Sequence, residues 1–242
     1  MKLILKEIRD EAKGTKSFFF EPEKPIEHRP GQFMYLTLKE LKYPDEKGAT
    51  RHLTISSSPT EGNLIRFTTR IREESGFKKS LSELPVGSEI EGEGPHGTFI
   101  ISDTEVGPHI FLAGGIGITP FRSIIKYITD KKLPHEVHLI YSNSVPEEIV
   151  FRKELEEIAA NNSNIEVSMT VSKPEESTEN WTGLKGRIDE NLIHELAPSE
   201  DEVMSSIWWF CGPPPFVTAM EEMFTKLKIP SNNIRVEKFT GY

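Results

Sequence analysis

Residues 109–121 read His109-Ile-Phe-Leu-Ala-Gly-Gly-Ile-Gly-Ile-Thr-Pro-Phe121, and this stretch decides the fold. It begins as a short apolar run typical of a buried parallel strand, passes three glycines in four positions, and continues with helical spacing of apolar residues to Ile128. Such glycines let a phosphate approach the backbone amides, and the following helix presents unpaired amides to the anion. A glycine turn also serves plain chain reversal, so both interpretations stay open at this point.

The turn departs from the fingerprint of ordinary dinucleotide-binding dehydrogenases. Pro120 stands where a third glycine is expected, and no acidic residue ends the next expected strand, residues 137–142. Proline is tolerated in the first turn of a helix, so the expected helix is kept. The stretch therefore predicts strand, glycine turn and helix, and it disfavours an ordinary Rossmann dehydrogenase.

The composition excludes several classes of protein. A chain of 242 residues makes one large domain or two ordinary ones, and its net charge of −9, with basic residues interleaved among acids, disfavours nucleic-acid partners. No run approaches the roughly 20 apolar residues of a membrane span, and residues 1–10 alternate in strand fashion unlike a signal peptide, so we expect a cytoplasmic protein without membrane contact. The oligomeric state stays open.

Metal chemistry is also disfavoured. The single cysteine, Cys211, excludes an internal disulfide and cannot alone hold an iron–sulfur cluster or zinc. The seven histidines lack metal-ligand spacing, apart from His135-x-x-His138, which falls at an expected strand entrance. We expect no metal, and any cluster chemistry then belongs to a partner.

The period of the apolar pattern divides the chain into two domains. Up to about residue 102 the period is two, which predicts a small antiparallel β-barrel; beyond residue 107 strands alternate with helices, which predicts a parallel sheet covered on both faces. We place the domains at residues 1–103 and 104–242. The expected strands are 3–5, 16–20, 33–38, 51–56, 64–71 and 89–93, then 109–113, 136–142, 165–171, 207–211 and 233–238; the expected helices are 77–84, 120–129, 147–159, 189–195 and 214–227.

Two stretches of the first domain have the character of anion sites. Arg51 opens a strand that ends in hydroxyl residues, which suits a phosphate beside a polar ring, although a serine-rich turn closed by Pro59 explains the same residues. Gly76 precedes a helix start that carries Lys78 and Lys79, where basic side chains oppose the helix dipole unless an anion is bound. A solvated helix start is the alternative.

Two stretches of the second domain complete the set. Cys211 ends a buried strand and is followed by glycine and three prolines, so we expect it to face one cavity with the 114–119 turn at the carboxyl edge of the sheet. A small buried hydrophobe is the alternative interpretation of this cysteine. The aromatic chain end, with Phe239 and Tyr242, suggests a lid over a flat ring, whereas frayed ends are the default.

Taken together in chain order, these motifs resemble the ferredoxin–NADP⁺ reductase-like flavoproteins over essentially the whole chain. Residues 51–54 resemble the family's Arg-x-Tyr-Ser flavin motif, with Leu53 in place of the tyrosine and Thr54 in place of the serine. Residues 76–79 are similar to its flavin-diphosphate segment, and residues 94–99 to its barrel closure. Residues 114–120 and 211–214 are similar to its two nicotinamide-nucleotide motifs.

The resemblance implies an NAD(P)H-dependent oxidoreductase. Hydride would pass from NAD(P)H to FAD, and electrons would then pass to a separate acceptor. It also implies residue roles: Thr54 beside the reactive flavin nitrogen, Cys211 and Thr119 flanking the nicotinamide, Glu237 near the reacting pair, and Tyr242 or Phe239 covering the flavin. The implied catalytic residues are Thr54, Cys211, Glu237 and Tyr242; the FAD-binding residues are Arg51, His52, Leu53, Thr54, Thr69, Ile71, Gly76, Phe77, Lys78, Lys79, Phe239 and Tyr242; the NAD(P)-binding residues are Gly115, Gly117, Ile118, Thr119, Ser142, Ser172, Lys173, Cys211, Gly212 and Pro213.

The sequence narrows the choice of flavin, nicotinamide nucleotide and electron acceptor only in part. A place for a diphosphate near residues 75–79 favours FAD over FMN. Ser172-Lys173 stands where NADP-using relatives place a Ser-Arg pair, which leans slightly to NADPH, with NADH left open. The acceptor would be a redox protein such as ferredoxin or flavodoxin, or a small acceptor. The alternatives are a reductase component of an oxygenase or other multi-subunit electron-transfer complex, and a non-enzymatic flavin or nucleotide sensor.

Overall fold

The structure is a computed structural model that describes all residues except 106, 197–198 and 240–242. By contacts it divides into two compact units. Among the described residues, the first contains Met1–Ile101 and, from further along the chain, Thr119–Asp130; the second contains Ser102–Ile118 and residues 131–239. Each unit is described by itself.

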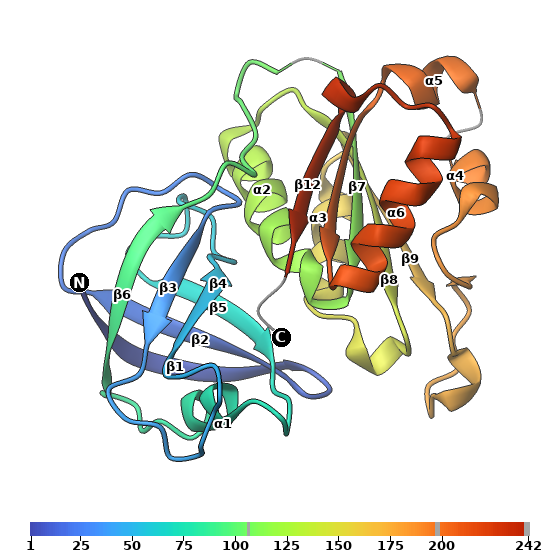
Figure 1. The fold of residues 1–242 in the computed structure, drawn as a ribbon. Coiled ribbons are helices and arrows are strands. Elements are labelled where there is room, and N and C mark those ends of the chain that lie inside the picture. Colours follow the sequence, from blue (N-terminus) through green and yellow to red (C-terminus); the bar gives the residue numbers. More distant parts are fainter. Residues whose placement is uncertain (106, 197–198, 240–242) are drawn as a thin grey trace. The chain divides into compact units, whose positions relative to one another are not determined.

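The first unit consists of an antiparallel six-stranded sheet, one short helix at residues 76–82, and the helical residues 119–130 (Figure 1). Its strand order is β4-β3-β6-β1-β2-β5, so β4 and β5 are the two edges. The edges approach each other at a bridge between Ile55 and Phe67, which gives the sheet its barrel-like form. The elements are β1 (Lys2–Ala12), β2 (Thr15–Pro22), β3 (Phe33–Thr37), β4 (Thr50–Thr54), β5 (Ile65–Arg70), α1 (Gly76–Ser82) and β6 (Glu89–His96).

Alternation along the strands fills the inside of this sheet with apolar side chains. Met34 and Leu53 are register partners on β3 and β4, and both are buried in the core. Phe77 and Leu81 of α1 belong to the same cluster, so the short helix is held by its apolar face. Packing therefore fixes α1 next to β4.

The second unit is a six-stranded parallel sheet with the order β10-β9-β8-β7-β11-β12. The chain builds one side from β7 to β10 and then returns to β11 beside β7, so the order reverses between these two strands. The elements are β7 (Pro108–Gly114), β8 (Glu136–Asn143), α3 (Arg152–Asn161), β9 (Ile165–Val171), β10 (Leu184–Lys185), α4 (Glu190–Leu196), α5 (Glu200–Ser205), β11 (Ile207–Gly212), α6 (Pro214–Lys226) and β12 (Ile234–Lys238).

One face of the parallel sheet packs on α4, α5 and α6 (Figure 1). Ile110, Leu112, Trp208 and Phe210 share this face with Phe224 of α6. Because side chains alternate along a strand, Trp209 and Cys211, which alternate with Trp208 and Phe210 on β11, point to the opposite face. The expected two-domain fold, an antiparallel barrel followed by a parallel α/β sheet, is confirmed.

Three local features differ from the sequence-based expectation. The helix expected at 147–159 begins only at Arg152, because Pro146–Glu148 form a 3₁₀ turn and Phe151 has a left-handed backbone. The short elements β10 and α5 have no clear periodic signal, since two and six residues are too few to show one. Helix α2 (Ile118–Lys131), expected in the second domain, groups through Thr119–Asp130 with the first unit.

Among the described residues, no helix is both long enough and apolar enough to cross a membrane.

Candidate functional site

The first unit has a cavity of about 870 Å³ beside the edge strand β4 and the start of α1. It lies where the sequence predicts an anion. Its wall contains Arg51 of β4 and Ser75 and Lys78 at the start of α1, three positions that the motifs single out. The full set of lining residues is Pro44, Asp45, Glu46, Lys47, Arg51, Arg72, Glu74, Ser75 and Lys78.

The cations of this wall are unusually buried. Arg51 is 7% exposed and Lys78 only 2% exposed, although lysine and arginine side chains are mostly exposed in folded proteins. Burial, together with the nearby charges of Arg72, Arg51, Lys47 and Arg70, lowers the pKa of Lys78 to about 7. The wall also contains the carboxylates Asp45, Glu46 and Glu74, and Asp45 is ion-paired with Arg51. An anion such as a phosphate group would add favourable contacts to the remaining cationic groups, so the cavity can hold one.

The anion at the start of α1 is supplied by the chain itself. The carboxylate of Asp45 accepts hydrogen bonds from the Phe77 amide at 2.9 Å, from Ser75 Oγ at 3.2 Å and from Arg51. Ser75 caps the helix by accepting from the Lys78 amide at 3.3 Å. The basic helix start is thus explained by Asp45, a residue that sequence analysis missed; an Asp-x-x-Gly turn shortly before Arg51 was the available signal.

The four residues of the Arg51–Thr54 motif divide between two faces. Arg51 and Leu53 point into the first unit, where Leu53 packs in the apolar core. His52 points outward and meets Phe33 and Tyr35, with ring centroids 5.5 and 6.0 Å apart. Thr54 ends the strand and is nearly buried. Only Arg51 of this motif lines the cavity.

Apart from Lys78, the remaining predicted flavin residues of this unit do not line the cavity. Thr69 is buried near the end of β5, and its hydroxyl has no hydrogen-bond partner within the described part of the chain. Ile71 follows β5 and packs against the apolar core. Gly76 and Phe77 lie in α1, and Lys79 turns away to pair with Glu73 at 2.8 Å. Gly76, Phe77 and Lys79 are not among the lining residues of the cavity.

In the second unit, the predicted nucleotide residues gather at the carboxyl edge where the strand order reverses. β7 and β11 are neighbours, with Ala113 opposite Cys211, and the glycine turn and Pro213 follow these two strands directly. In open α/β sheets, ligands bind outside the carboxyl ends of the strands at such a reversal. The topology therefore brings the two nicotinamide-nucleotide motifs to one edge.

The three glycines of the turn, at positions 114, 115 and 117, are required for different physical reasons. A Cβ on Gly117 would lie 2.1 Å from the backbone oxygen of Cys211, and one on Gly114 would lie 2.6 Å from the ring of Phe216. Both glycines are therefore required by packing. Gly115 has a φ of +51° and open space where its Cβ would be, so it leaves room for a visiting group.

Cys211, which is fully buried, and the half-buried Glu237 are neighbours at the same edge. They are register partners on β11 and β12, and Phe239 follows with its amide donating to the Gly212 oxygen at 3.1 Å. Burial raises the pKa of the Cys211 thiol well above its usual value, and the Glu237 charge adds to this. Burial also raises the pKa of Glu237. The thiol is thus neutral at physiological pH, and Glu237 can hold a proton more readily than an exposed carboxylate.

The predicted adenosine-side residues lie on the neighbouring strand ends. Ser142 lies near the end of β8, and Ser172 and Lys173 follow β9, with the Ser172 amide bonded to the Asn143 oxygen at 3.0 Å. Lys173 donates to Glu176 at 2.8 Å. Asn143, missed by sequence analysis, is 5% exposed, and neither atom of its amide group has a hydrogen-bond partner among the residues described.

Ile118 and Thr119 begin α2 and are buried.

Tyr242 lies outside the described residues, so its lid role stays a prediction. Over the described residues, no group of three or more histidine, cysteine, aspartate or glutamate side chains could hold a metal ion.

Comparison with known proteins identifies both domains. Residues 2–101 match the family of oxidoreductase FAD-binding domains, and residues 111–222 match the family of oxidoreductase NAD-binding domains. The chain belongs to the oxidoreductases that join an FAD-binding to an NAD-binding domain. Its fold is that of solved ferredoxin reductases. The buried cations of the first unit and the open Gly115 of the second fit the anionic diphosphates of these two cofactors.

Several characterised relatives share this pair of domains. The chain is 27% identical over 230 residues to the glycine betaine monooxygenase reductase subunit of Chromohalobacter salexigens, covering 93% of this chain and 60% of that protein. It is 32% identical over 195 residues to NADH-cytochrome b5 reductase 1 of Cryptococcus neoformans, covering 76% and 64%. The chain thus spans about three-fifths of the length of these relatives.

The same fold is found among solved structures. A cytochrome P450 reductase of Amycolatopsis superposes with a TM-score of 0.84 at 21% identity, over 99% of this chain and 70% of that one.

Proposed function

We propose that this chain is an NAD(P)H-dependent reductase that holds FAD in its first unit and passes electrons to a separate acceptor. The observation that carries the proposal is the cavity lined by the buried cations Arg51 and Lys78, within a domain that matches the FAD-binding family. The bound flavin would supply the chemistry, accepting a hydride and releasing electrons singly or in pairs.

The chain's own residues would bind and orient the two nucleotides. Arg51 and Lys78 would neutralise the flavin diphosphate, and Thr54 would offer its hydroxyl to the flavin ring. Cys211, whose pKa burial raises, would present a neutral surface to the nicotinamide rather than a charged one. Glu237, with its raised pKa, would hold or release a proton near the reacting atoms.

Purified full-length protein tests this proposal directly. We expect it to be yellow or to take up FAD when supplied, and we expect NADH or NADPH to bleach the flavin absorbance under anaerobic conditions. Ferricyanide reduction would then separate an enzyme from a sensor, since a sensor would bind both nucleotides with negligible turnover. A protein that takes up no FAD, or FAD-loaded protein that neither nucleotide reduces, would contradict the proposal.

A reductase component of an oxygenase is the second candidate. Its support is that relatives are the reductase subunits of glycine betaine monooxygenase and of stachydrine N-demethylase. Rates of reduction of purified ferredoxin, flavodoxin and oxygenase components would rank the acceptors. A cytoplasmic location and a domain boundary at residues 103–104 are part of the proposal, and cell fractionation and limited proteolysis test them.

A further inference from the structure

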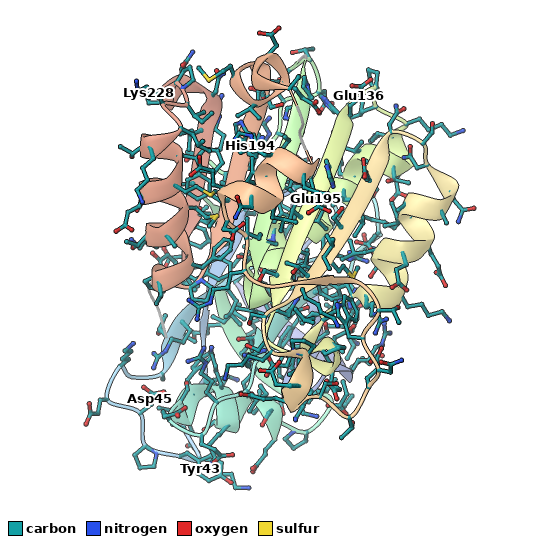
Figure 2. All side chains as sticks on the ribbon, turned by 90° about the vertical axis from the view of Figure 1, so that its right-hand side faces the viewer. Tyr43, Asp45, Glu136, His194, Glu195 and Lys228 are labelled. Atoms are coloured by element: carbon teal, nitrogen blue, oxygen red, sulfur yellow. The ribbon has the colours of Figure 1, made fainter. Side chains whose placement is uncertain are left out.

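The loop between β3 and β4 holds a carboxylate inside the cofactor cavity. Asp45 lines the cavity, its side chain is only 5% exposed, and Figure 2 labels it on this loop together with Tyr43. In addition to the hydrogen bonds from Phe77, Ser75 and Arg51, the Asp45 carboxylate accepts a hydrogen bond from the Lys47 amide at 3.0 Å. Burial alone would raise the pKa of Asp45, but the Phe77 and Lys47 amides and the Arg51 guanidinium lower it below its usual value, so Asp45 is ionised at neutral pH.

The loop is fastened to α1 before Asp45. A Cβ on Gly76 would lie 2.2 Å from the Pro44 oxygen, so only glycine allows this approach of loop and helix. The Tyr43 amide donates to Ser80 Oγ at 3.2 Å, and the Tyr43 hydroxyl donates to Glu83 at 2.8 Å. Asp45 is therefore held in place by its neighbours and does not depend on its own charge alone.

The loop is fastened to Arg51 after Asp45. Nη1 of Arg51 donates to the carbonyl oxygens of Lys47 at 2.9 Å, Gly48 at 3.0 Å and Thr50 at 2.6 Å, and Nη2 donates to Asp45. A guanidinium has five N–H groups. With both N–H groups of Nη1 and one of Nη2 engaged, the Nε–H and one Nη2–H remain for a ligand.

We propose that Asp45 is a positioning residue of the flavin cavity, which orients Arg51 and occupies the anion position at the start of α1. Recognition of the flavin diphosphate is then left to side chains: Lys78, Arg72 and the remaining N–H groups of Arg51. The inference rests on the proposed function, because it assumes that the cavity takes FAD.

Displacement of Asp45 by the diphosphate is the competing account. Two observations disfavour it: the loop is anchored on both sides of Asp45, and the cavity of about 870 Å³ is open with Asp45 in place. The two accounts predict opposite effects. Positioning predicts weaker FAD binding when the carboxylate is neutralised, whereas displacement predicts tighter binding.

Titration of flavin-free protein with FAD, followed by flavin fluorescence, distinguishes them. For Asp45→Asn we expect the Kd to rise by about tenfold or more, the effect of one lost charge-assisted hydrogen bond. Glu40→Gln is the control, because it removes a negative charge from the same loop at an exposed residue that does not line the cavity, and we expect its Kd to stay within about threefold of wild type.

A double-mutant cycle with Arg51→Lys separates positioning from general stability. If Asp45 acts through Arg51, Asp45→Asn costs little further FAD affinity once Arg51 is replaced. If the two substitutions act independently, the loss of FAD affinity in the double variant is the sum of the two single losses, in free energy. Hydrogen exchange of the wild type needs no variant: the amides of Lys47 and Phe77 stay protected with and without FAD if Asp45 stays in place.

Each outcome bears on one of the two proposals. Asp45→Asn protein that binds FAD as tightly as wild type or tighter, additive costs in the cycle, or a Lys47 amide that loses protection on FAD addition would each overturn the positioning role alone. Wild-type protein that binds no FAD would overturn the proposed function, and the role of Asp45 with it.

Discussion

Arg122 in α2 and Glu61 in the loop after β4 form a bidentate ion pair, with Nη2 to Oε1 at 2.7 Å and Nη1 to Oε2 also in contact. Arg122 also donates to the Ser56 oxygen at 3.0 Å, and Ser123 Oγ donates to the Ser57 oxygen at 2.7 Å. These contacts join the helix after the nucleotide turn to the loop that follows Thr54. They explain why α2 groups with the first unit.

Replacing Arg122 tests this connection. Arg122 is 3% exposed, so Arg122→Gln leaves a partly buried carboxylate without its cation, and we expect a loss of about 2–4 kcal/mol in the free energy of unfolding. Urea denaturation measures it. Lys126→Gln, which breaks an ion pair with Asp130 on the same helix, should cost less than about 1 kcal/mol. An equal loss of unfolding free energy in the two variants would show that the Arg122–Glu61 pair stabilises the protein no more than an exposed ion pair does.

The buried lysine of the flavin cavity predicts pH-dependent binding. Lys78 has a pKa of about 7 because of burial and the charges of Arg72, Arg51, Lys47 and Arg70, and a bound phosphate would favour its protonated form. FAD binding should therefore take up protons, and FAD affinity should fall by up to about tenfold per pH unit above pH 7. Calorimetry in buffers of different ionisation enthalpy measures the uptake.

Two variants control the Lys78 prediction. Lys78→Arg keeps the charge at all accessible pH values, so its FAD affinity should lose most of the pH dependence. Lys79→Gln removes an exposed charge that is paired with Glu73, and the pH dependence should survive. Wild-type affinity that is flat between neutral and alkaline pH would refute the assignment to Lys78.

The glycines of the nucleotide turn should differ sharply in their tolerance to alanine. Gly117→Ala places a Cβ 2.1 Å from the Cys211 backbone oxygen, so we expect a loss of more than about 3 kcal/mol or no folded protein. Gly115→Ala meets open space and pays only for its positive φ, about 1 kcal/mol, so it should fold. Thermal unfolding compares them, and a Gly117→Ala protein as stable as Gly115→Ala would contradict the packing argument.

Nucleotide preference depends on the partner of Lys173. Glu176 accepts from Lys173, and Glu175 stands in the same 3₁₀ turn, so this strand end offers little net positive charge to a 2′-phosphate. We therefore expect NADH to be at least as good a substrate as NADPH, against the slight lean of the sequence. Glu176→Gln should raise the NADPH/NADH ratio of kcat/KM several-fold, and Glu175→Gln should raise it less. An unchanged ratio in Glu176→Gln would remove Lys173 from nucleotide selection.

A buried histidine predicts acid sensitivity of the second unit. His109 is fully buried and accepts from Trp209 Nε1 at 3.2 Å, and burial, His135 and Arg235 lower its pKa to about 4. The unfolded chain binds the proton near pH 6.5, so this stability is complete above that pH and is lost as the pH falls toward 4. We expect a loss of about 3 kcal/mol over this range.

The histidine prediction is checked by urea unfolding at a series of pH values. His109→Gln keeps a hydrogen-bond acceptor but does not titrate, so its stability should fall less steeply between pH 6.5 and 4. His194→Gln is the control, because His194 lies half-exposed on α4, where Figure 2 labels it. Parallel pH profiles for wild type and His109→Gln would exclude His109 as the cause.

The sequence by itself determined the two-domain order and nearly every strand. Alternation along residues 33–38 and 51–56 predicts half-buried antiparallel strands, and the change to alternating strands and helices after residue 107 predicts the parallel sheet. The carboxyl-edge rule also brought Cys211 and the 114–119 turn to one edge of the sheet. The element types follow from local periodicity, which can be seen in the sequence, and the shared edge follows from the general rule for open parallel sheets.

Only the tertiary structure decided which residues, distant in the sequence, are in contact. It showed that Asp45 supplies the anion at the start of α1, that Leu53 packs inward while His52 points outward, and that Gly117 is required by the Cys211 backbone. It also showed that Arg122 ties α2 to the first unit. Each depends on atoms brought together from distant positions in the chain, and the periodicity of a segment carries no information about its non-local partners.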